Sequence, residues 1–255
     1  MIKKLQSITN KVPPLVSLLF VFFLWLFVSE GGFIPAYMLP SPIEVVKAFA
    51  ADFSVIIRHA LVTLEEAISG LLIGTVLGFI ISVLMDRFSF LYKALYPVIV
   101  ITQTIPTIAI APLLVLWMGF SVAPKITLVV ITTFFPITVS LLDGFKGADK
   151  DAVRLLKSMG ATRLQIFRHI KIPSALPSFF SGFKVSASYA VVGAVIAEWL
   201  GGFEGLGVYM TRVKKAYAFD KMFAVIIFIC LASLILMGAV TLISKISMPW
   251  NKNKN

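Results

Sequence analysis

The chain has 255 residues, of which 59% are hydrophobic and only 14% charged, and its mean hydropathy is +0.97. A soluble domain is about 25% charged, so this composition excludes a water-soluble globular fold and predicts an all-α, polytopic membrane helix bundle. A net charge of +11 would suggest a nucleic-acid partner in a soluble protein, but the membrane topology described below explains it without one.

Charged residues bracket uncharged runs that are long enough for membrane helices, which need about 20 residues. Three lysines before the first run are also typical of a signal peptide, but no small-x-small cleavage site follows, which favours a span. We therefore expect a single transmembrane domain over residues 1–255. Its six predicted spans are residues 13–29, 63–85, 94–118, 125–142, 175–199 and 222–244.

The basic residues are distributed unevenly over the two sides that six spans define. Fifteen of the 23 Lys and Arg residues fall on the side of the two termini, seven on the other side, and Lys184 within a span. The positive-inside rule assigns the richer side to the cytoplasm. We therefore expect a multi-pass protein of the inner or plasma membrane, surrounded by lipid, with both termini and residues 149–173 in the cytoplasm.

The outer segment after the first span is rich in proline and then becomes helix-like. Ile43, Val46, Ala50 and Phe53 recur at helical spacing between charged residues. Two interpretations stay open at this point. The segment is either a short amphipathic helix whose apolar face lies on the outer membrane interface, or an ordered loop.

The second predicted span carries glycines at intervals of four residues, Gly70, Gly74 and Gly78. Glycines with this spacing form a groove on one helix face, so that another backbone can approach closely. We interpret them as a helix-packing face. The sequence leaves open whether the neighbouring helix belongs to the same chain or to another copy.

The third predicted span contains three prolines, and Pro106 is expected to kink it. Irregular backbone in a bilayer is tolerated only where protein or a water-filled cavity satisfies its polar groups. The polar side chains near the kink should therefore face the bundle interior, either lining a translocation path or bonding neighbouring helices. The candidate path residues are Thr102, Gln103, Thr104 and Thr107, together with Ser186 and Tyr189 of the fifth span.

Two ionisable residues, Lys184 and Glu198, fall in the fifth predicted span. An ionisable residue within a span is by default a functional hypothesis. The alternative is that Lys184 extends to the cytoplasmic edge of the membrane and that Glu198 is hydrated at the outer end.

No pattern typical of covalent chemistry is present. The sequence lacks a G-x-x-x-x-G-K-[ST] phosphate-binding loop. Its two histidines, His59 and His169, are expected on opposite sides of the membrane, so they should not form a metal pair. We therefore expect no catalytic residues, no metal site and no cofactor in this chain.

The cytoplasmic segment 149–173 is predicted to form two short helices. Asp149 is a candidate N-cap for the first helix, and Gly160 should end it by adopting a left-handed conformation. Thr162 and Gln165 fit a capping box for the second helix.

Pro173 is expected to close this segment before the fifth span. Each short helix has one apolar face rimmed by Arg and Lys. Such a ridge fits the groove of another protein, but a helix pair resting on anionic lipid headgroups would look the same. The residues on these faces are Val153, Leu156, Met159, Leu164, Phe167 and Ile170.

The same segment resembles the cytoplasmic loop of ABC importer permeases, which reads Glu-Ala-Ala, three residues, Gly, nine residues, Ile-x-Leu-Pro. Gly160, Ile170 and Pro173 match that spacing, with Ile172 at the Leu position. The beginning departs from the pattern, because Arg-Leu-Leu at 154–156 replaces Glu-Ala-Ala and removes the usual acidic contact.

Four further stretches resemble the subgroup of these permeases that serves sulfonates, taurine, nitrate and thiamine-precursor pyrimidines. They read LPSPIEVVKAF, IPTIAIAPLLVLWMG, FFPITVSLLDG and AEWLGGFEGLG, and the similarity covers residues 39–245. Two segments, LLKSMG and YAFDKMFA, look most like the pyrimidine-precursor branch.

The resemblance implies a permease subunit that forms the translocation path for a small organic solute, such as a thiamine-precursor pyrimidine or an aliphatic sulfonate. ATP would be bound by separate ABC ATPase subunits at the cytoplasmic face. The other implied partners are an extracytoplasmic solute-binding protein and a second permease copy in a homodimer. The candidate ATPase-coupling residues are Asp151, Arg154, Leu155, Leu156, Lys157, Met159, Gly160, Ala161, Arg163 and Pro173.

The competing interpretation is a secondary transporter that works without an ATPase subunit. Inverted repeats between the two halves of the chain would support it, and none is visible in the sequence.

Overall fold

The computed structural model describes residues 2–35 and 37–250, with the backbone alone described for residues 2–11. Throughout these residues the secondary structure is helical, without a strand. Lys252 and Lys254, which contribute to the charge asymmetry, lie outside the described residues.

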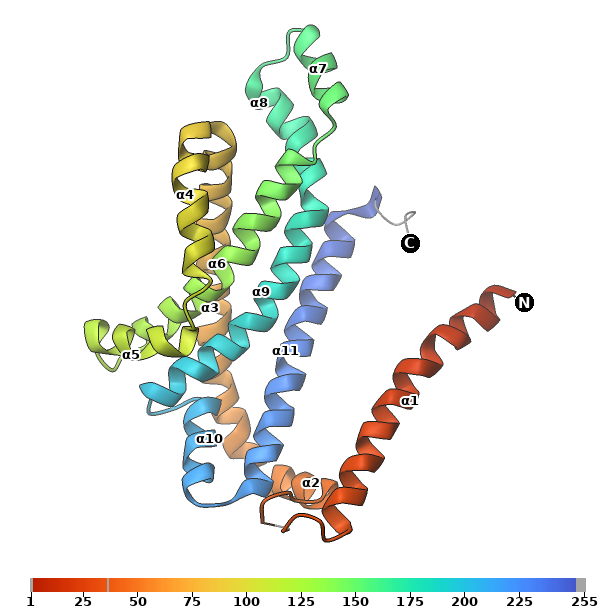
Figure 1. The fold of residues 1–255 in the computed structure, drawn as a ribbon, viewed down its shortest axis with the longest axis vertical. Coiled ribbons are helices and arrows are strands. Elements are labelled where there is room, and N and C mark those ends of the chain that lie inside the picture. Colours follow the sequence, from red (N-terminus) through yellow and green to blue (C-terminus); the bar gives the residue numbers. More distant parts are fainter. Residues whose placement is uncertain (1, 36, 251–255) are drawn as a thin grey trace. The chain divides into compact units, whose positions relative to one another are not determined.

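Figure 1 labels the helices in chain order. They are α1 (Ile2–Glu30), α2 (Pro42–Ala51), α3 (Phe53–Arg87), α4 (Ser89–Thr102), α5 (Thr107–Met118), α6 (Ala123–Lys146), α7 (Lys150–Ser158), α8 (Arg163–Ile166), the π-helical turn η1 (Phe167–Lys171), α9 (Ile172–Leu200), α10 (Leu206–Lys215) and α11 (Phe219–Ser247).

The chain, expected to be one domain over residues 1–255, divides into two compact units. Unit 1 comprises Met1–Ile57 and Tyr209–Phe228, and unit 2 comprises Arg58–Val208 and Ile229–Asn255.

Five helical segments of the described chain are long and apolar enough to cross a membrane, and they contain five of the six predicted spans. Their bounds are Val12–Glu30, Phe53–Arg87, Ala123–Lys146, Arg163–Leu200 and Phe219–Ser247.

The third predicted span, 94–118, differs from the expectation of one kinked helix. Helices α4 and α5 are separate and meet at an angle of 100°. With 14 and 12 residues, each is shorter than the roughly 20 residues that a span requires. Pro106 precedes α5 and has no N–H to continue the helical hydrogen bonding from α4. The pair is therefore a broken span or a re-entrant loop.

Helix α2 confirms the helical alternative for the outer segment. Ser41 caps it, and a complete capping box joins the Ser41 and Glu44 side chains to each other's backbone N–H groups. On the predicted apolar face, Ile43 and Val46 are 55% and 67% exposed, so this face is not buried within the chain and stays available to the membrane interface. The helix instead buries the stripe that contains Val45 and Ala48. Apolar residues lie on two faces of α2, and the face that contains Val45 and Ala48 is the one that packs against the rest of the chain.

In unit 1, Asp52 joins the end of α2 to two other helices. Its carboxylate accepts a hydrogen bond from the Tyr209 hydroxyl and lies 2.7 Å from the Lys221 ammonium. Lys221, and secondarily Tyr209, hold the pKa of the Asp52 carboxyl below its usual range, against the opposing effect of partial burial. Burial, and secondarily the hydrogen bond to the Asp52 carboxylate, raise the pKa of Tyr209.

In unit 2, the glycine stripe of α3 packs against α6 of the same chain. A Cβ atom at Gly74 would lie 2.3 Å from Thr133 Oγ1. One at Gly70 would lie 2.5 Å from the Val129 side chain, and Gly78 faces the same helix. The question that the sequence left open is thus answered for this stripe: its neighbour is within the chain.

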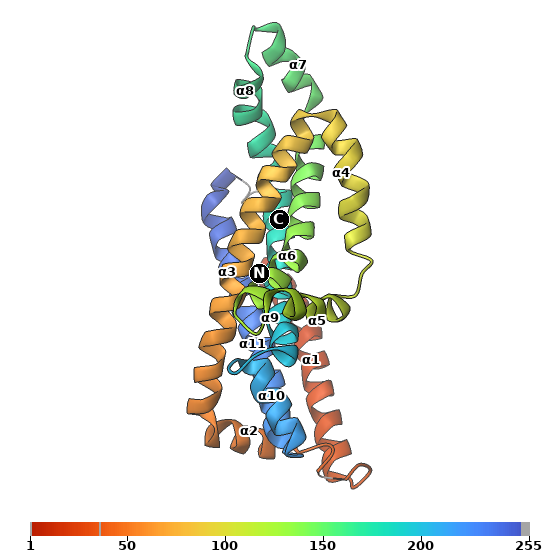
Figure 2. The same ribbon diagram turned by 90° about the vertical axis from the view of Figure 1, so that its left-hand side faces the viewer.

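Helix α9 packs along an adjacent face of α6 (Figures 1 and 2), and its glycines also lie close to α6. A Cβ atom at Gly182 would lie 2.3 Å from Ser140 Oγ, and one at Gly193 would lie 3.1 Å from Thr132 Oγ1. The buried core of unit 2 lies mainly along these three helices. Small residues allow the backbones of α3 and α9 to approach α6 closely, which favours strong van der Waals packing in lipid.

We predict that Gly74→Val lowers the free energy of unfolding by about 1–3 kcal/mol, because the added methyl groups overpack the α3–α6 contact. Gly238→Val is the matched control, since no atom lies within 4 Å of a Cβ atom at Gly238. Thermal unfolding of both variants in detergent measures the difference. Equal unfolding temperatures would contradict the packing role of Gly74.

We also predict an acid-dependent loss of stability that depends on Asp52. A carboxyl whose pKa is lowered by folding stabilises the protein above its unfolded pKa of about 3.9. That contribution disappears as the pH falls through the lower folded pKa, when the carboxylate takes up a proton. Unfolding of the wild type and Asp52→Asn between pH 7 and pH 3 should show that the variant lacks this part of the acid dependence. Parallel curves would contradict it.

Candidate functional sites: the coupling segment and the solute path

The first helix of segment 149–173, α7, begins and ends as predicted. The Asp149 side chain accepts hydrogen bonds from the backbone N–H groups of Asp151 and Ala152, at 2.8 and 3.3 Å. Gly160 has φ +80° and the Ala161 N–H bonds back to the Leu156 carbonyl, which ends the helix in a left-handed turn. The sequence alone therefore specifies both boundaries.

The second helix also begins as predicted, at the capping box of Thr162 and Gln165. It does not end at Pro173, and this expectation is wrong. The chain continues from α8 through the π-helical turn η1 into α9, and Pro173 lies in the first turn of α9. Proline is tolerated in the first turn of a helix, because the N–H groups of that turn have no partner within the helix. In the π-helical turn η1 that precedes α9, the Ile172 N–H donates to the Phe167 carbonyl.

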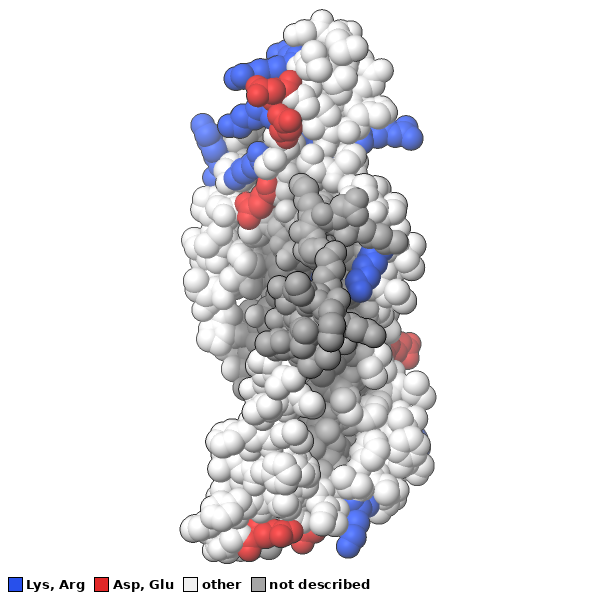
Figure 3. All heavy atoms as spheres, turned by 90° about the vertical axis from the view of Figure 1, so that its right-hand side faces the viewer, with Lys and Arg blue, Asp and Glu red and all other residues white. Residues whose placement is uncertain are grey.

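Large apolar side chains project from α7 and α8 into solvent. Leu155, Met159 and Leu164 are 62%, 72% and 74% exposed, whereas Leu156 is partly buried. Arg154 pairs with Asp151 at 3.3 Å, so an acidic group lies one turn before the position where the family pattern has Glu. Figure 3 shows basic side chains gathered at this end of the molecule.

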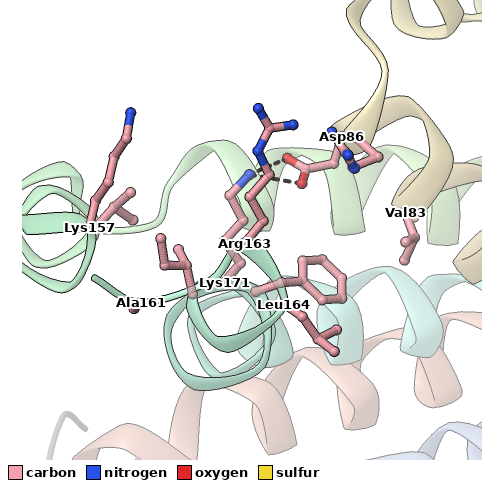
Figure 4. Close-up of a pocket in the computed structure, with 11 residues that line it drawn as sticks. Val83, Asp86, Lys157, Ala161, Arg163, Leu164 and Lys171 are labelled. Atoms are coloured by element: carbon pink, nitrogen blue, oxygen red, sulfur yellow. Dashed lines mark hydrogen bonds and ion pairs between the residues drawn. The ribbon is translucent and has the colours of Figure 1, made fainter. Parts of the chain in front are cut away.

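The segment is braced against the membrane helices. Lys171 Nζ lies 2.7 and 2.8 Å from the two Asp86 carboxylate oxygens, which joins η1 to the end of α3 (Figure 4). The Phe145 and Phe167 rings, 5.3 Å apart between centroids, join the end of α6 to η1. These two contacts hold η1 against α3 and α6. They therefore limit how far α8, which continues directly into η1, can move relative to the membrane helices.

A groove of about 660 Å³ separates the end of α3 from α7 and α8 (Figure 4). Three predicted coupling residues, Lys157, Ala161 and Arg163, line it together with the Asp86–Lys171 ion pair. Lys157 and Arg163 give the lining of the groove positive charge, and Val83, Leu164 and Phe167 contribute apolar side chains to it.

A second cavity, of about 270 Å³, lies between the α4–α5 break and helices α6 and α9. Four of the six predicted path residues line it: Thr102, Gln103, Thr107 and Tyr189. The sequence analysis missed Thr132 of α6, which also lines it, because nothing in its local sequence distinguishes an inward from an outward polar residue.

The other two predicted path residues, Thr104 and Ser186, lie outside this cavity. Thr104 donates a hydrogen bond to the Ile101 carbonyl within the break. Ser186 is fully buried and donates to the Thr133 carbonyl of α6, at 2.9 Å. Ser186 therefore joins α9 to α6, whereas the Thr104 hydroxyl satisfies a backbone carbonyl of its own segment.

Near the C-terminal end of α9, Glu198 is buried, with 1% exposure, so the alternative of a hydrated side chain is wrong. Glu66 and Lys125, which fall within the predicted spans 63–85 and 125–142, are buried too and form an ion pair at 2.6 Å. The sequence could have indicated that these residues are paired, because both fall inside predicted spans, where a charged side chain needs a partner. Pairing them required knowledge of which helices are adjacent.

Comparison with known proteins now defines the family. Residues 70–246 match the model of the binding-protein-dependent transport system inner membrane component family. The chain belongs to this family. It is an ABC importer permease, and not a secondary transporter.

The formylaminopyrimidine transport permease protein ThiX of Halalkalibacterium halodurans is 38% identical over 219 residues, which cover 86% of this chain and 88% of that protein. The putative aliphatic sulfonates transport permease protein SsuC of Bacillus subtilis is 26% identical and covers 90% of this chain and 84% of its own length.

Among solved structures, a chain of the MetNI methionine ABC transporter superimposes with a TM-score of 0.68. The sequence identity is 18%, and the match covers 76% of this chain and 97% of that chain. The all-helical permease fold is therefore shared at low sequence identity.

Proposed function

We propose that this permease, as a homodimer, carries a neutral thiamine-precursor pyrimidine across the inner membrane, driven by separate ATPase subunits. The observation that supports the solute class is the uncharged lining of the path cavity. Its polar groups are one amide and several hydroxyls, set among Ile and Val side chains.

This lining suits a small heteroaromatic solute better than a sulfonate. The Gln103 amide offers both a donor and an acceptor, which match ring nitrogens and amino groups. The Thr102 and Thr132 hydroxyls donate to backbone carbonyls of their own helices and offer the cavity acceptors. The Tyr189 ring offers a face for stacking. A sulfonate is a permanent anion, and none of the residues lining the cavity carries a positive charge to balance it. The likeness to ThiX, the formylaminopyrimidine permease, points the same way.

In this proposal the exposed ridge of α7 and α8 binds the ATPase at the cytoplasmic face, where both chain termini also lie. ATP and its hydrolysis belong to that partner, and the permease contributes no catalytic residue or cofactor. The ridge is apolar at Leu155 and Met159 and rimmed by basic side chains, as docking into a protein groove requires. The Asp86–Lys171 bridge then passes a displacement of η1, which continues directly from α8, to α3.

The path is completed by a second permease copy. Helix α5 exposes Leu116 and Trp117, at 77% and 71%, beside the path cavity to which Thr107 and Ile110 of the same helix belong. An apolar surface next to a polar path is suited to a dimer contact, with lipid covering the remaining outer surface.

The test is reconstitution of the permease in proteoliposomes with its ATPase and its solute-binding protein. ATP-dependent uptake of radiolabelled formylaminopyrimidine, and no uptake of an aliphatic sulfonate, is expected. Uptake of the sulfonate alone would overturn the solute assignment, and uptake without the ATPase would overturn the importer mechanism.

We predict that Gln103→Leu lowers uptake of the pyrimidine roughly threefold to tenfold, which is the effect of losing about one hydrogen bond in the path. Thr104→Val is the matched control, because Thr104 is adjacent in sequence but outside the cavity. Initial uptake rates at equal ATP hydrolysis measure the difference. Equal losses in both variants would contradict a path role for Gln103.

We predict that Gly160→Val uncouples ATP hydrolysis from uptake. No atom lies within 4 Å of a Cβ atom at Gly160, so the effect comes from the left-handed backbone, which costs a residue with a Cβ about 1–2 kcal/mol. Gly160→Asn is the control, since asparagine tolerates this conformation. The measurement is solute imported per ATP hydrolysed. Normal coupling in the valine variant would show that the turn is not needed.

A further inference from the structure

A buried cluster of polar side chains joins three membrane helices at the outer end of unit 2. We call it the outer clamp. It consists of His59, Thr63 and Glu66 of α3, Lys125 of α6 and Glu198 of α9, each at most 6% exposed. None of these residues lines the path cavity or the groove at the coupling segment.

The first half of the clamp is the Glu66–Lys125 ion pair. The two side chains are 2% and 6% exposed, and Nζ lies 2.6 Å from Oε1. Removing one partner would leave an uncompensated buried charge, which is strongly unfavourable. The ion pair therefore holds the outer ends of α3 and α6 together, because separating the helices would leave both charges buried without a partner.

The second half of the clamp holds the start of α10. The first N–H groups of a helix have no partner within it. Here the Gly207 N–H donates to Glu198 Oε2 at 2.6 Å, and the Leu206 N–H donates to Thr63 Oγ1 at 2.8 Å. Thr63 in turn donates to Glu198 Oε1 at 2.7 Å. One hydroxyl and one carboxylate thus join α3, α9 and the start of α10.

His59 and two glycines complete the arrangement. The Gly205 N–H donates to His59 Nδ1 at 3.0 Å, and Gly205 has φ +124°. A Cβ atom at Gly205 would lie 2.2 Å from the Glu198 carboxyl group, and one at Gly207 would lie 2.3 Å from a backbone carbonyl. The segment 201–207 lies against the clamp only because glycine occupies these positions.

The clamp and the coupling segment lie at opposite ends of one closely packed body. Figures 1 and 2 show α7 and α8 at one end of α6 and α9, and the junction of α9 with α10 at the other. Between the two ends, glycines of α3 and α9 bring their backbones against α6, as at Gly74 and Gly182. A displacement applied at α7 and α8 therefore meets a stiff body and not a flexible chain.

We infer that the outer clamp is a positioning device for the transport cycle. It makes the outer ends of α3, α6 and α9, with the segment 201–207, follow the displacement that the ATPase imposes on the coupling segment. The inference rests on the proposed function, because it assumes that α7 and α8 receive the stroke. Without the clamp, each outer helix end would relax separately and the path would open incompletely.

Thr63→Val tests the clamp in the complete transporter. The substitution keeps the shape of the side chain and removes the hydroxyl that joins Glu198 to the Leu206 N–H. The matched control is Thr75→Val on the same helix, because the Thr75 hydroxyl bonds only to the Leu71 carbonyl of its own helix. Thr63→Ser keeps the hydroxyl and serves as the conservative rescue.

In proteoliposomes, the Thr63→Val complex should assemble and hydrolyse ATP at the wild-type basal rate. Solute imported per ATP should fall by about fivefold, the equivalent of one lost hydrogen bond, and stimulation of hydrolysis by the loaded binding protein should be lost. Thr75→Val and Thr63→Ser should match the wild type in both measurements. Wild-type import per ATP in Thr63→Val, or an equal loss in Thr75→Val, would overturn the inference.

If Thr63→Val does not assemble, the exchange of charges in Glu66→Lys with Lys125→Glu decides the question. The exchanged pair should restore assembly and import per ATP above the level of Lys125→Met. An exchanged pair no better than that single variant would overturn the inference. A wild-type complex that imports nothing with ATP would instead refute the proposed function, so the two failures are distinguishable.

Discussion

The structure depends on the close approach of α3 and α9 to α6. In lipid, helices gain little from hiding apolar surface from water, so packing at short range must supply the attraction. Glycines provide it on two faces of α6, at Gly74 for α3 and at Gly182 for α9, where any larger side chain would collide with α6. The resulting three-helix body is the part of unit 2 against which the other features are positioned.

The polar features of unit 2 are arranged around this body at both ends. At the coupling end, the Asp86–Lys171 bridge joins α3 to the helical extension of α9. At the outer end, the Glu66–Lys125 pair joins α3 to α6. Each bridge is between different helices, so bending the body at either end would expose or separate a charged pair. The uncharged path cavity lies between them, where α4 and α5 break and leave polar side chains beside α6 and α9.

Much of the local structure follows from the sequence because its causes are local. The caps at Asp149 and Thr162 and the left-handed turn at Gly160 were predicted correctly, since each depends on residues within one helical turn. The continuation through Pro173 was not predicted, because the local sequence does not show the π-helical turn η1 that precedes α9 and places Pro173 in its first turn. The angle between α4 and α5 was also missed, since Pro106 predicts a break but not its direction.

The sequence by itself determined the membrane class, the approximate spans and the two capped helices of segment 149–173, because hydropathy and capping patterns are read along the chain. Only the tertiary structure decided which polar residues face inward and which charges pair. Gln103 lines the cavity beside α6 and α9 but its sequence neighbour Thr104 does not, and Glu66 and Lys125 are 59 positions apart in the chain. The physical reason is that burial and ion pairing depend on which helix faces are adjacent, and close packing of the helices, not local sequence, selects those faces.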